Sequence, residues 1–308
     1  MTSNLGIDVG GTKTRAVLLS ADGVELAESV RPTRPGADGV IATALAVTDD
    51  CCRLAGISTR GVASIGVGIP GVVDPSSGRV RTAVNLEVSE LDLGPRLAVA
   101  TAAPVTVEND VKCAALGACE YLAAADLTYL NFGTGVAAAA VVHGAVIRGR
   151  GNVAGEIGHL PVDPSAELCN CGQRGCLEVL AGGGHLANRL AAAGLDLAGL
   201  VAAADAGDLT ARAEADRLSA GVATAVQVVV LTYGSPTIVL GGGVIQHAAG
   251  LLPRVRRVLA ERAGSSEFIS SLDLAGRLAV IPSDHPVAAV GAALIGRAGV
   301  PRFAETSP

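Results

Sequence analysis

Near its start the chain reads Leu5-Gly-Ile-Asp-Val-Gly-Gly-Thr-Lys-Thr-Arg-Ala-Val-Leu-Leu19, two apolar stretches on either side of a glycine-threonine turn. A second stretch has the same form, Thr128-Tyr-Leu-Asn-Phe-Gly-Thr-Gly-Val-Ala-Ala-Ala-Ala-Val-Val142. Apolar segments joined by glycine-containing turns are typical of β-hairpins. Each stretch therefore predicts a hairpin at the start of a domain.

Further strands and Ala-rich helical patterns follow each hairpin, which predicts an α/β fold in two parts. The third strands are expected at Val24–Arg31 and Ala145–Arg148. The other expected strands are Ala63–Ile69, Val105–Val107, Thr237–Leu240 and Ala279–Ile281. The expected helices are Gly39–Ala55, Val111–Ala123, Ala181–Ala193, Ala211–Thr232, Leu251–Ala263 and Pro286–Arg297.

The length, charge and hydropathy of the chain indicate how many domains it has and which partners are excluded. The 308 residues suffice for two domains, and a net charge of −6 gives no sign of a nucleic-acid surface. The N-terminal residues have neither a basic nor an apolar leader segment, so we expect a cytoplasmic protein with reduced thiols. The stretch between Arg217 and Arg254 has no charged residue, but polar residues interrupt it. It predicts a buried helix, a turn and a buried strand, and no membrane span.

A histidine and three closely spaced cysteines predict a zinc site at His159, Cys169, Cys171 and Cys176. Three thiolates and one imidazole complete a tetrahedral zinc shell. The alternative is a set of buried thiols or a disulfide. Glu156 and Glu178 flank the group, and a metal that held both carboxylates in place would suit the recognition of a polyol.

The first turn and a later Asn-Asp pair could carry phosphate chemistry. Glycine N–H groups at Gly10 and Gly11, with Thr12 and Lys13, could contact phosphate, although the turn lacks the Walker A spacing. The alternative is a plain tight turn. The pair Asn109-Asp110 follows an apolar strand, where α/β folds place active sites. Its alternative role is to cap the next helix.

Seven motifs together resemble the ROK family (repressor, open reading frame, kinase) of the actin-like ATPase superfamily, over Leu5 to about Gly296. They are Asp8-Val-Gly-Gly-Thr-Lys13, Gly68-Ile-Pro-Gly71, Glu108-Asn-Asp110, Gly133-Thr-Gly-Val136, Gly155-Glu-Ile-Gly-His159, Cys169-x-Cys-Gly-x-x-Gly-Cys-x-Glu178 and Gly241-Gly-Gly243. The resemblance implies an α/β fold of two ribonuclease-H-like domains around a central cleft. We expect an N-terminal domain at 1–118, joined by a C-terminal helix at about 286–308, and a larger domain with the zinc motif at 119–285.

The resemblance also implies roles for individual residues. ATP would be bound by Asp8, Gly10, Gly11, Thr12, Lys13, Gly133, Thr134, Gly135, Gly242 and Gly243, with Asp8 helping to place Mg²⁺. The sugar would be contacted by Gly71, Asn109, Asp110, Glu156, His159 and Glu178, with Asn85 a lesser candidate. Asp110 would be the general base, and the zinc would be structural. The implied activity is an ATP-dependent hexose kinase, with glucose as the first candidate and the primary hydroxyl as the acceptor.

Some positions depart from the family pattern. Ala137, Ala138 and Ala139 follow the second turn where the family usually has glycines, and this could weaken ATP binding. The Gly-Trp that often follows this asparagine in the family is absent after Asn85, so the sequence does not identify the sugar. An N-acetylated amino sugar or another hexose is therefore a second candidate substrate, and a non-catalytic sugar-binding protein is a third reading. Family repressors carry a DNA-binding segment before the first turn, where only seven residues precede Asp8, so we expect no nucleic-acid partner. The family is commonly dimeric or tetrameric, so a homo-oligomer is expected.

Overall fold

A computed structural model describes residues 3–165 and 167–299. The chain divides into two compact units. Of the described residues, unit 1 contains those up to Ala124, the segment Arg148–Val153 and those from Asp284 to Gly299, and unit 2 contains those within Ala125–Ile147 and Ala154–Ser283. The six residues Arg148–Val153 are thus part of unit 1, although the chain on both sides of them belongs to unit 2. The predicted domain limits of 1–118 with 286–308, and 119–285, stay a prediction.

Unit 1 is built on a sheet of five strands in the order β3-β2-β1-β4-β8. The predicted hairpin is present as an antiparallel pair, and the later strands run parallel to β1. The strands are β1 (Ser3–Val9), β2 (Lys13–Ser20), β3 (Glu25–Pro32), β4 (Val62–Ile69) and β8 (Val105–Asn109). A smaller sheet, which we did not predict, contains β5 (Val72–Asp74), β6 (Arg79–Ala83) and β7 (Val88–Leu91).

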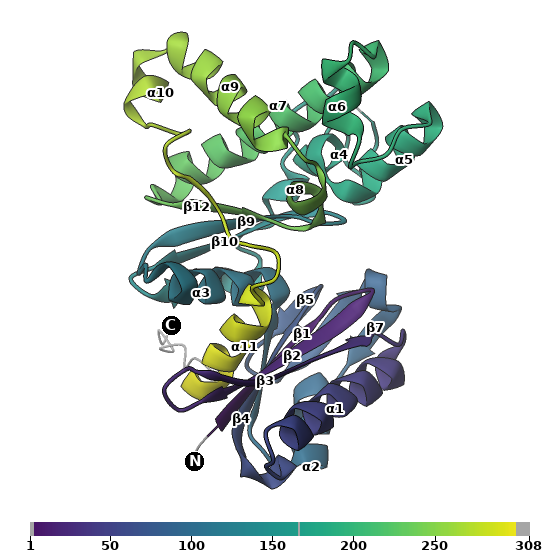
Figure 1. The fold of residues 1–308 in the computed structure, drawn as a ribbon, viewed down its shortest axis with the longest axis vertical. Helices are drawn as coiled ribbons and strands as arrows, with labels where there is room; N and C mark the ends of the chain where they lie inside the picture. Colours follow the sequence, from purple (N-terminus) through teal and green to yellow (C-terminus); the bar gives the residue numbers. More distant parts are fainter. Residues whose placement is uncertain (1–2, 166, 300–308) are drawn as a thin grey trace. The chain divides into compact units, whose positions relative to one another are not determined.

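Helices cover both faces of the unit 1 sheet (Figure 1). They are α1 (Ala37–Leu54), α2 (Leu93–Thr101), α3 (Asp110–Leu122) and α11 (Val287–Ala298). Successive residues of β2 lie on opposite faces of the sheet. Leu18 belongs to the core with α1, whereas Val17 packs with α11. A side chain at Gly6 or Gly66 would collide with the backbone of α11. These glycines let the last helix lie directly on β1 and β4.

Unit 2 repeats the same strand arrangement in the order β11-β10-β9-β12-β13. The second predicted hairpin is the antiparallel pair β9–β10, and β12 runs parallel to β9. The strands are β9 (Leu127–Phe132), β10 (Val136–Val142), β11 (Ala145–Val146), β12 (Ile238–Gly241) and β13 (Leu278–Val280). The two sheets with one topology confirm the predicted fold class of two α/β parts.

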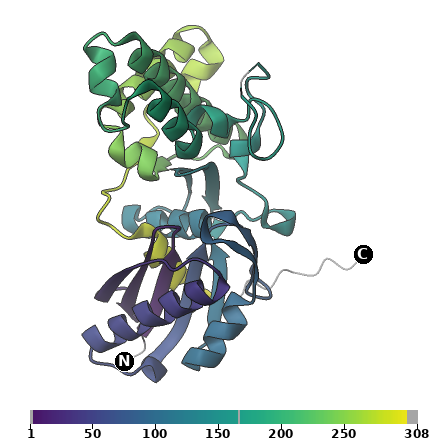
Figure 2. The same ribbon diagram turned by 90° about the vertical axis from the view of Figure 1, so that its right-hand side faces the viewer.

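In unit 2 the long helix α7 (Leu209–Tyr233) contacts β9, α4, α6 and α9 (Figure 2). The others are α4 (Leu177–Ala181), α5 (Gly183–Ala193), α6 (Leu200–Asp205), α8 (Gly243–His247), α9 (Leu251–Gly264) and α10 (Glu267–Ser271). Among the described residues α7 alone is long and apolar enough to span a membrane, and 56% of its most apolar window is buried inside the protein. Its buried residues belong to the unit 2 core, and the sequence predicted it as a buried helix.

Two predicted elements differ from the structure. The strand expected at Ala145–Arg148 ends at Val146, because the chain leaves the unit 2 sheet there and Arg148 joins unit 1. The helix expected at Ala181–Ala193 begins only at Gly183, as α5, because Gly182 has extended backbone angles and Ala181 is the last residue of α4.

Candidate functional site

The turn between β1 and β2 is closed by a hydrogen bond from the Gly10 N–H to the Lys13 carbonyl at 3.0 Å. The Thr33 hydroxyl donates to the Gly10 carbonyl at 2.7 Å and so fixes the outer side of the turn. Gly11 lies against Asn85, where an added Cβ would be 3.2 Å from the Asn85 carbonyl oxygen. Residues 11–13 are exposed, so their N–H groups and the Lys13 ammonium are open to an anion.

Asp8 and Asp110 lie at the same end of the unit 1 sheet. Asp8 pairs in register with Gly68, and Gly68 pairs with Glu108 on the next strand. A Cβ on Gly68 would be 3.1 Å from the Cys113 sulfur and 3.4 Å from the Asp110 Cα, so glycine leaves the space beside Asp110 open. Parallel strands thus bring both acids to their carboxyl ends, where α/β folds bind ligands.

The two carboxyl groups interact. Burial raises the pKa of Asp8 to about 7, and the negative charge of Asp110 adds to that rise, against opposing effects of Arg15 and Lys13. Carboxylates that share a site disfavour each other's ionised form. A hard cation such as Mg²⁺ prefers oxygen ligands and would relieve this repulsion, so this donor set fits the metal expected near Asp8.

Asn109 takes the capping role that was the alternative for Asp110. Its side-chain oxygen accepts from the N–H groups of Val111 at 3.0 Å and Lys112 at 3.3 Å, so Asn109 is the N-cap of α3. Asp110 is the first residue of that helix and accepts from the Val111 N–H at 3.0 Å. The helix begins one residue earlier than predicted.

A buried polar network holds the segment Arg148–Val153 beside this turn. The Glu108 carboxylate accepts from Arg148 at 2.6 Å, from the Asn152 side chain at 3.0 Å and from the Asn109 N–H at 2.9 Å. The buried Lys112 ammonium donates to the Asn152 carbonyl at 3.0 Å. Sequence reasoning missed this network, because the partners are about forty residues apart and no local pattern joins them.

The second turn, Gly133–Gly135, packs on the start of α5 in unit 2. The N–H groups of Gly183 and Gly184 donate to the carbonyls of Gly133 and Thr134, each at 2.8 Å. The Glu178 carboxylate accepts from the Val136 N–H at 3.1 Å. This arrangement brings the turn and Glu178 together.

The alanines after the second turn occupy ordinary strand positions. Ala137, Ala138 and Ala139 pair in register with Asn131, Leu130 and Tyr129 of β9. None of the three has a positive φ angle. Alanine therefore costs little conformational energy at these positions, and the predicted weakness of the turn does not follow from its backbone.

His159, Cys169, Cys171 and Cys176 converge in unit 2. Their four ligand atoms all lie within 4.8 Å of one another. The Cys171 and Cys176 sulfurs are 3.6 Å apart, and Cys169 Sγ is 3.8 Å from His159 Nδ1. All seven cysteines are free thiols, so the disulfide alternative is not present.

Those separations fit a zinc ion. With Zn–S bonds of about 2.3 Å, the corners of a tetrahedron lie about 3.8 Å apart. Gly172 and Gly175 have φ angles of 92° and 67°, which turn the chain so that Cys176 returns beside Cys171. Hydrogen bonds from the Gln173 backbone and side chain lower the pKa of Cys171 to about 6, whereas burial raises the pKa of Cys176 to about 12. The cluster has the donor atoms and the spacing of a structural zinc site.

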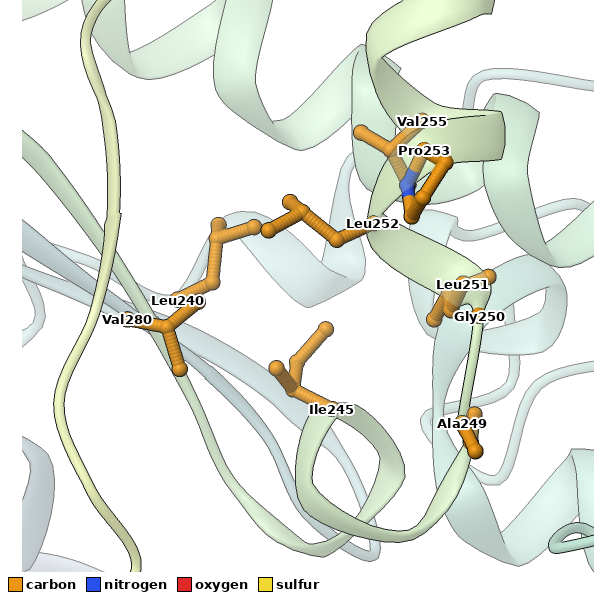
Figure 3. Close-up of a pocket in the computed structure, with 10 residues that line it drawn as sticks. Leu240, Ile245, Ala249, Gly250, Leu251, Leu252, Pro253, Val255 and Val280 are labelled. Atoms are coloured by element: carbon orange, nitrogen blue, oxygen red, sulfur yellow. The ribbon is translucent and has the colours of Figure 1, made fainter.

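An apolar cavity lies between β12, α8 and the start of α9. Gly242 has a φ of 89° and precedes α8, and a Cβ there would lie 2.5 Å from the Phe132 carbonyl. The cavity of about 240 Å³ is lined by Leu240, Ile245, Leu252, Val255 and Val280 among others (Figure 3).

Gly71 and Glu156 are the remaining two of the expected sugar residues. Gly71 has a φ of 100° and lies close to the Thr82 carbonyl and Ala83. The backbone of this turn therefore accounts for the glycine at this position. Glu156 is exposed at the start of the short helix Ile157–His159.

The sequence is related to sugar kinases and to repressors. It is 31% identical to a glucokinase of Halalkalibacterium halodurans over 82% of this chain and 84% of the relative. It is 30% identical to an N-acetylmannosamine kinase of Citrobacter koseri over 84% of this chain and 89% of the relative. It is 29% identical to a xylose repressor of Caldicellulosiruptor bescii over 57% of this chain and 45% of that protein.

Solved structures match the whole fold. The ROK hexokinase from Thermus thermophilus superimposes with a TM-score of 0.82 at 28% identity, covering 96% of this chain and 98% of that one. A ROK family glucokinase from Streptomyces griseus, in complex with glucose and AMPPNP, gives a TM-score of 0.76 at 25% identity, covering 96% of this chain and 100% of that one. The family model for ROK matches residues 4–297, and the chain therefore belongs to the ROK family, with the actin-like ATPase fold.

Proposed function

We propose that this protein is an ATP-dependent sugar kinase that transfers the γ-phosphate to the primary hydroxyl of a hexose, with glucose as the first candidate. The observation that supports it most is the pair of interacting carboxyls, Asp8 and Asp110, at the carboxyl end of the unit 1 sheet. Phosphoryl transfer needs a cation site and a base at one place, and two neighbouring carboxyls can divide those tasks.

Asp110 is proposed as the general base. It would accept the proton of the sugar hydroxyl as that oxygen attacks the γ-phosphorus, which is worth about 10²- to 10⁴-fold in rate for a well-placed base. The Asn109 cap and the Glu108 network fix the turn that carries it. Asp8 would help to hold Mg²⁺, which neutralises charge on the phosphates when bound.

The nucleotide would be bound by the two glycine turns and the loop after β12. In unit 1 the exposed turn Gly10-Gly11-Thr12-Lys13 offers N–H groups, a hydroxyl and an ammonium. In unit 2 the turn Gly133-Thr134-Gly135 is proposed for the same task. Gly242 and Gly243 are proposed to contact the adenosine, and the apolar cavity lined by Leu240 and Ile245 is proposed for the base.

The sugar would be recognised by Asn109, Asp110, Glu156, His159 and Glu178, with Gly71 shaping a nearby turn. Carboxylates accept hydrogen bonds from neighbouring hydroxyls and so select the arrangement of the ring substituents. Zinc on His159 and the three cysteines would hold these side chains in place and take no part in the reaction.

Two alternatives remain as proposals of lower rank. A kinase for an N-acetylated amino sugar is favoured by the N-acetylmannosamine kinase relative. A non-catalytic sugar-binding protein is favoured by the xylose repressor among the relatives. We further propose a cytoplasmic homo-oligomer without a nucleic-acid or membrane partner.

The test is a coupled ADP-release assay with ATP and Mg²⁺ across hexoses and N-acetylhexosamines. Turnover on one sugar that falls by about 10²-fold or more in Asp110→Asn supports the kinase and its base. Asp92→Asn, an exposed acid of unit 1, is the matched control and should keep full activity. Silence with every sugar, in folded protein that contains zinc, refutes the kinase in favour of a binding protein.

A further inference from the structure

His185 is a half-buried histidine that none of the motifs above includes. It lies on the first turn of α5, two residues after Gly183. The N–H groups of Gly183 and Gly184 are bonded to the carbonyls of the Gly133–Gly135 turn, so this end of α5 is fixed in place. These bonds fix the backbone from which the His185 side chain extends.

Those neighbours are a zinc-site cysteine and a sugar-site carboxylate. One ring nitrogen of His185, the Cys169 sulfur and a Glu178 oxygen all lie within 4.8 Å of one another. The Nε2 atom of His185 is buried and has no hydrogen-bond partner. A buried polar atom without a partner is costly, and native proteins rarely leave one. The nearby acceptors can supply the missing bond.

Both acceptors have capacity to spare. Glu178 receives one hydrogen bond, from the Val136 N–H at 3.1 Å, and a carboxylate has about four acceptor positions. Cys169 becomes a thiolate when it binds zinc, and a metal-bound thiolate also accepts hydrogen bonds. Neutral histidine has one N–H, which suits one of these partners directly.

We propose that His185 is a positioning residue that donates its ring N–H to the Glu178 carboxylate while its ring packs on the zinc-bound Cys169. The imidazole thereby connects the zinc site with the carboxylate that is proposed to contact the sugar. The zinc part of this inference stands on the cluster geometry alone, whereas the sugar part rests on the proposed function.

Zinc affinity tests the connection without any assay of activity. We expect His185→Ala to bind zinc about 10- to 100-fold more weakly than the wild type in competition with a colorimetric chelator, since outer partners of metal sites have effects of that size. His185→Gln keeps an N–H donor for Glu178 but lacks the ring that packs on Cys169, so its zinc affinity should stay below that of the wild type. The control is His143→Ala in the same unit, where the side chain is 91% exposed, and its affinity should equal that of the wild type.

Cobalt spectroscopy separates a positioning residue from a metal ligand. Cobalt bound by three thiolates and one imidazole should give the same absorption bands in the wild type and in His185→Ala, because His159 supplies the nitrogen. Bands that change with the loss of His185 would make it a ligand and overturn the proposal. Equal zinc affinity in His185→Ala and the wild type would overturn it as well.

Sugar kinetics provide the second readout. In an active kinase, His185→Ala should raise KM for the sugar more than it lowers kcat, because a displaced Glu178 weakens binding and leaves Asp110 intact. An unchanged KM for the sugar overturns the link to Glu178. A wild type that phosphorylates no sugar refutes the proposed function, and the zinc measurements then still decide the role of His185.

Discussion

Glu108 and Arg148 form an ion pair of 2.6 Å in unit 1, with only 1% and 14% of their side chains exposed. The pair joins the last strand of the sheet to the segment Arg148–Val153, whose neighbours in the sequence belong to unit 2. Because Glu108 also accepts the N–H of Asn109, one carboxylate holds this segment and the turn before Asp110 at the same time.

Removal of one partner should therefore destabilise unit 1 strongly. We expect Glu108→Ala to lower the free energy of unfolding by about 3–5 kcal/mol, because it leaves the Arg148 charge buried and unpaired. Urea unfolding followed by far-ultraviolet circular dichroism measures the change. The double variant Glu108→Ala/Arg148→Ala should lose less than the sum of the two single changes.

An exposed ion pair of the same unit is the control. Asp38 pairs with Arg96 while 92% of its side chain is exposed, so Asp38→Ala should cost about 1 kcal/mol or less. If Glu108→Ala cost no more than this control, the pair would not hold the segment.

Asp8 should make the stability of the protein depend on pH. Its carboxyl has a pKa of about 7 in the folded protein, against 3.8 ordinarily. Between these values the folded protein binds more protons than the unfolded chain, so the contribution of Asp8 to stability falls as the pH rises through this window. We expect the Tm of the wild type, without Mg²⁺, to fall from about pH 5 to about pH 7 by more than that of Asp8→Asn. Parallel curves for the two proteins would refute the shift.

Zinc should protect Cys171 from alkylation. Cys171 is the exposed member of the four-residue cluster, and donation from Gln173 lowers its pKa to about 6, so it carries a reactive thiolate near neutral pH. After removal of zinc with a chelator, iodoacetamide should modify Cys171 before the buried Cys51 and Cys52, as peptide mass spectrometry would show. Added zinc should slow the reaction. A rate that zinc does not change would argue against metal binding at this cluster.

Local patterns were sufficient to predict the hairpins and the zinc cluster. The turn at Gly10 and the cysteines around Gly172 lie within short stretches, where residue type and spacing determine the geometry. The ROK fold followed from the order of such motifs. The break at Gly182 was missed, although the run Gly182–Gly184 is a signal that could have shown it, since glycine disfavours a helix interior.

Contacts between distant segments could not be predicted from a single sequence. Nothing near Glu108 indicates that its partner is Arg148, and nothing near His185 indicates Cys169. Such partners depend on how the strands and helices pack in three dimensions. The small sheet β5–β7 was missed for a related reason, since its strands are short and their pairing is decided by the loops around them.

Gly135 offers a direct test of the proposed role of Glu178. A Cβ at Gly135 would collide with the Glu178 Oε2 atom, whereas one at Gly133 would approach the Asn131 side chain at 3.2 Å. We expect Gly135→Ala to displace the carboxylate and to raise KM for the sugar, because a flexible side chain moves more readily than the backbone.

The second turn contains its own control for this change. Gly133→Ala adds the same methyl group two residues away and leaves Glu178 in place, so it should alter KM for the sugar less than Gly135→Ala does. Both variants should bind one zinc ion, since neither residue belongs to the cluster of His159 and the three cysteines. Equal KM values for the sugar in the two variants would show that the Glu178 carboxylate does not contribute to binding. A rise confined to Gly135→Ala would tie sugar affinity to the position of that carboxylate, because the two changes differ only in the neighbour that they displace.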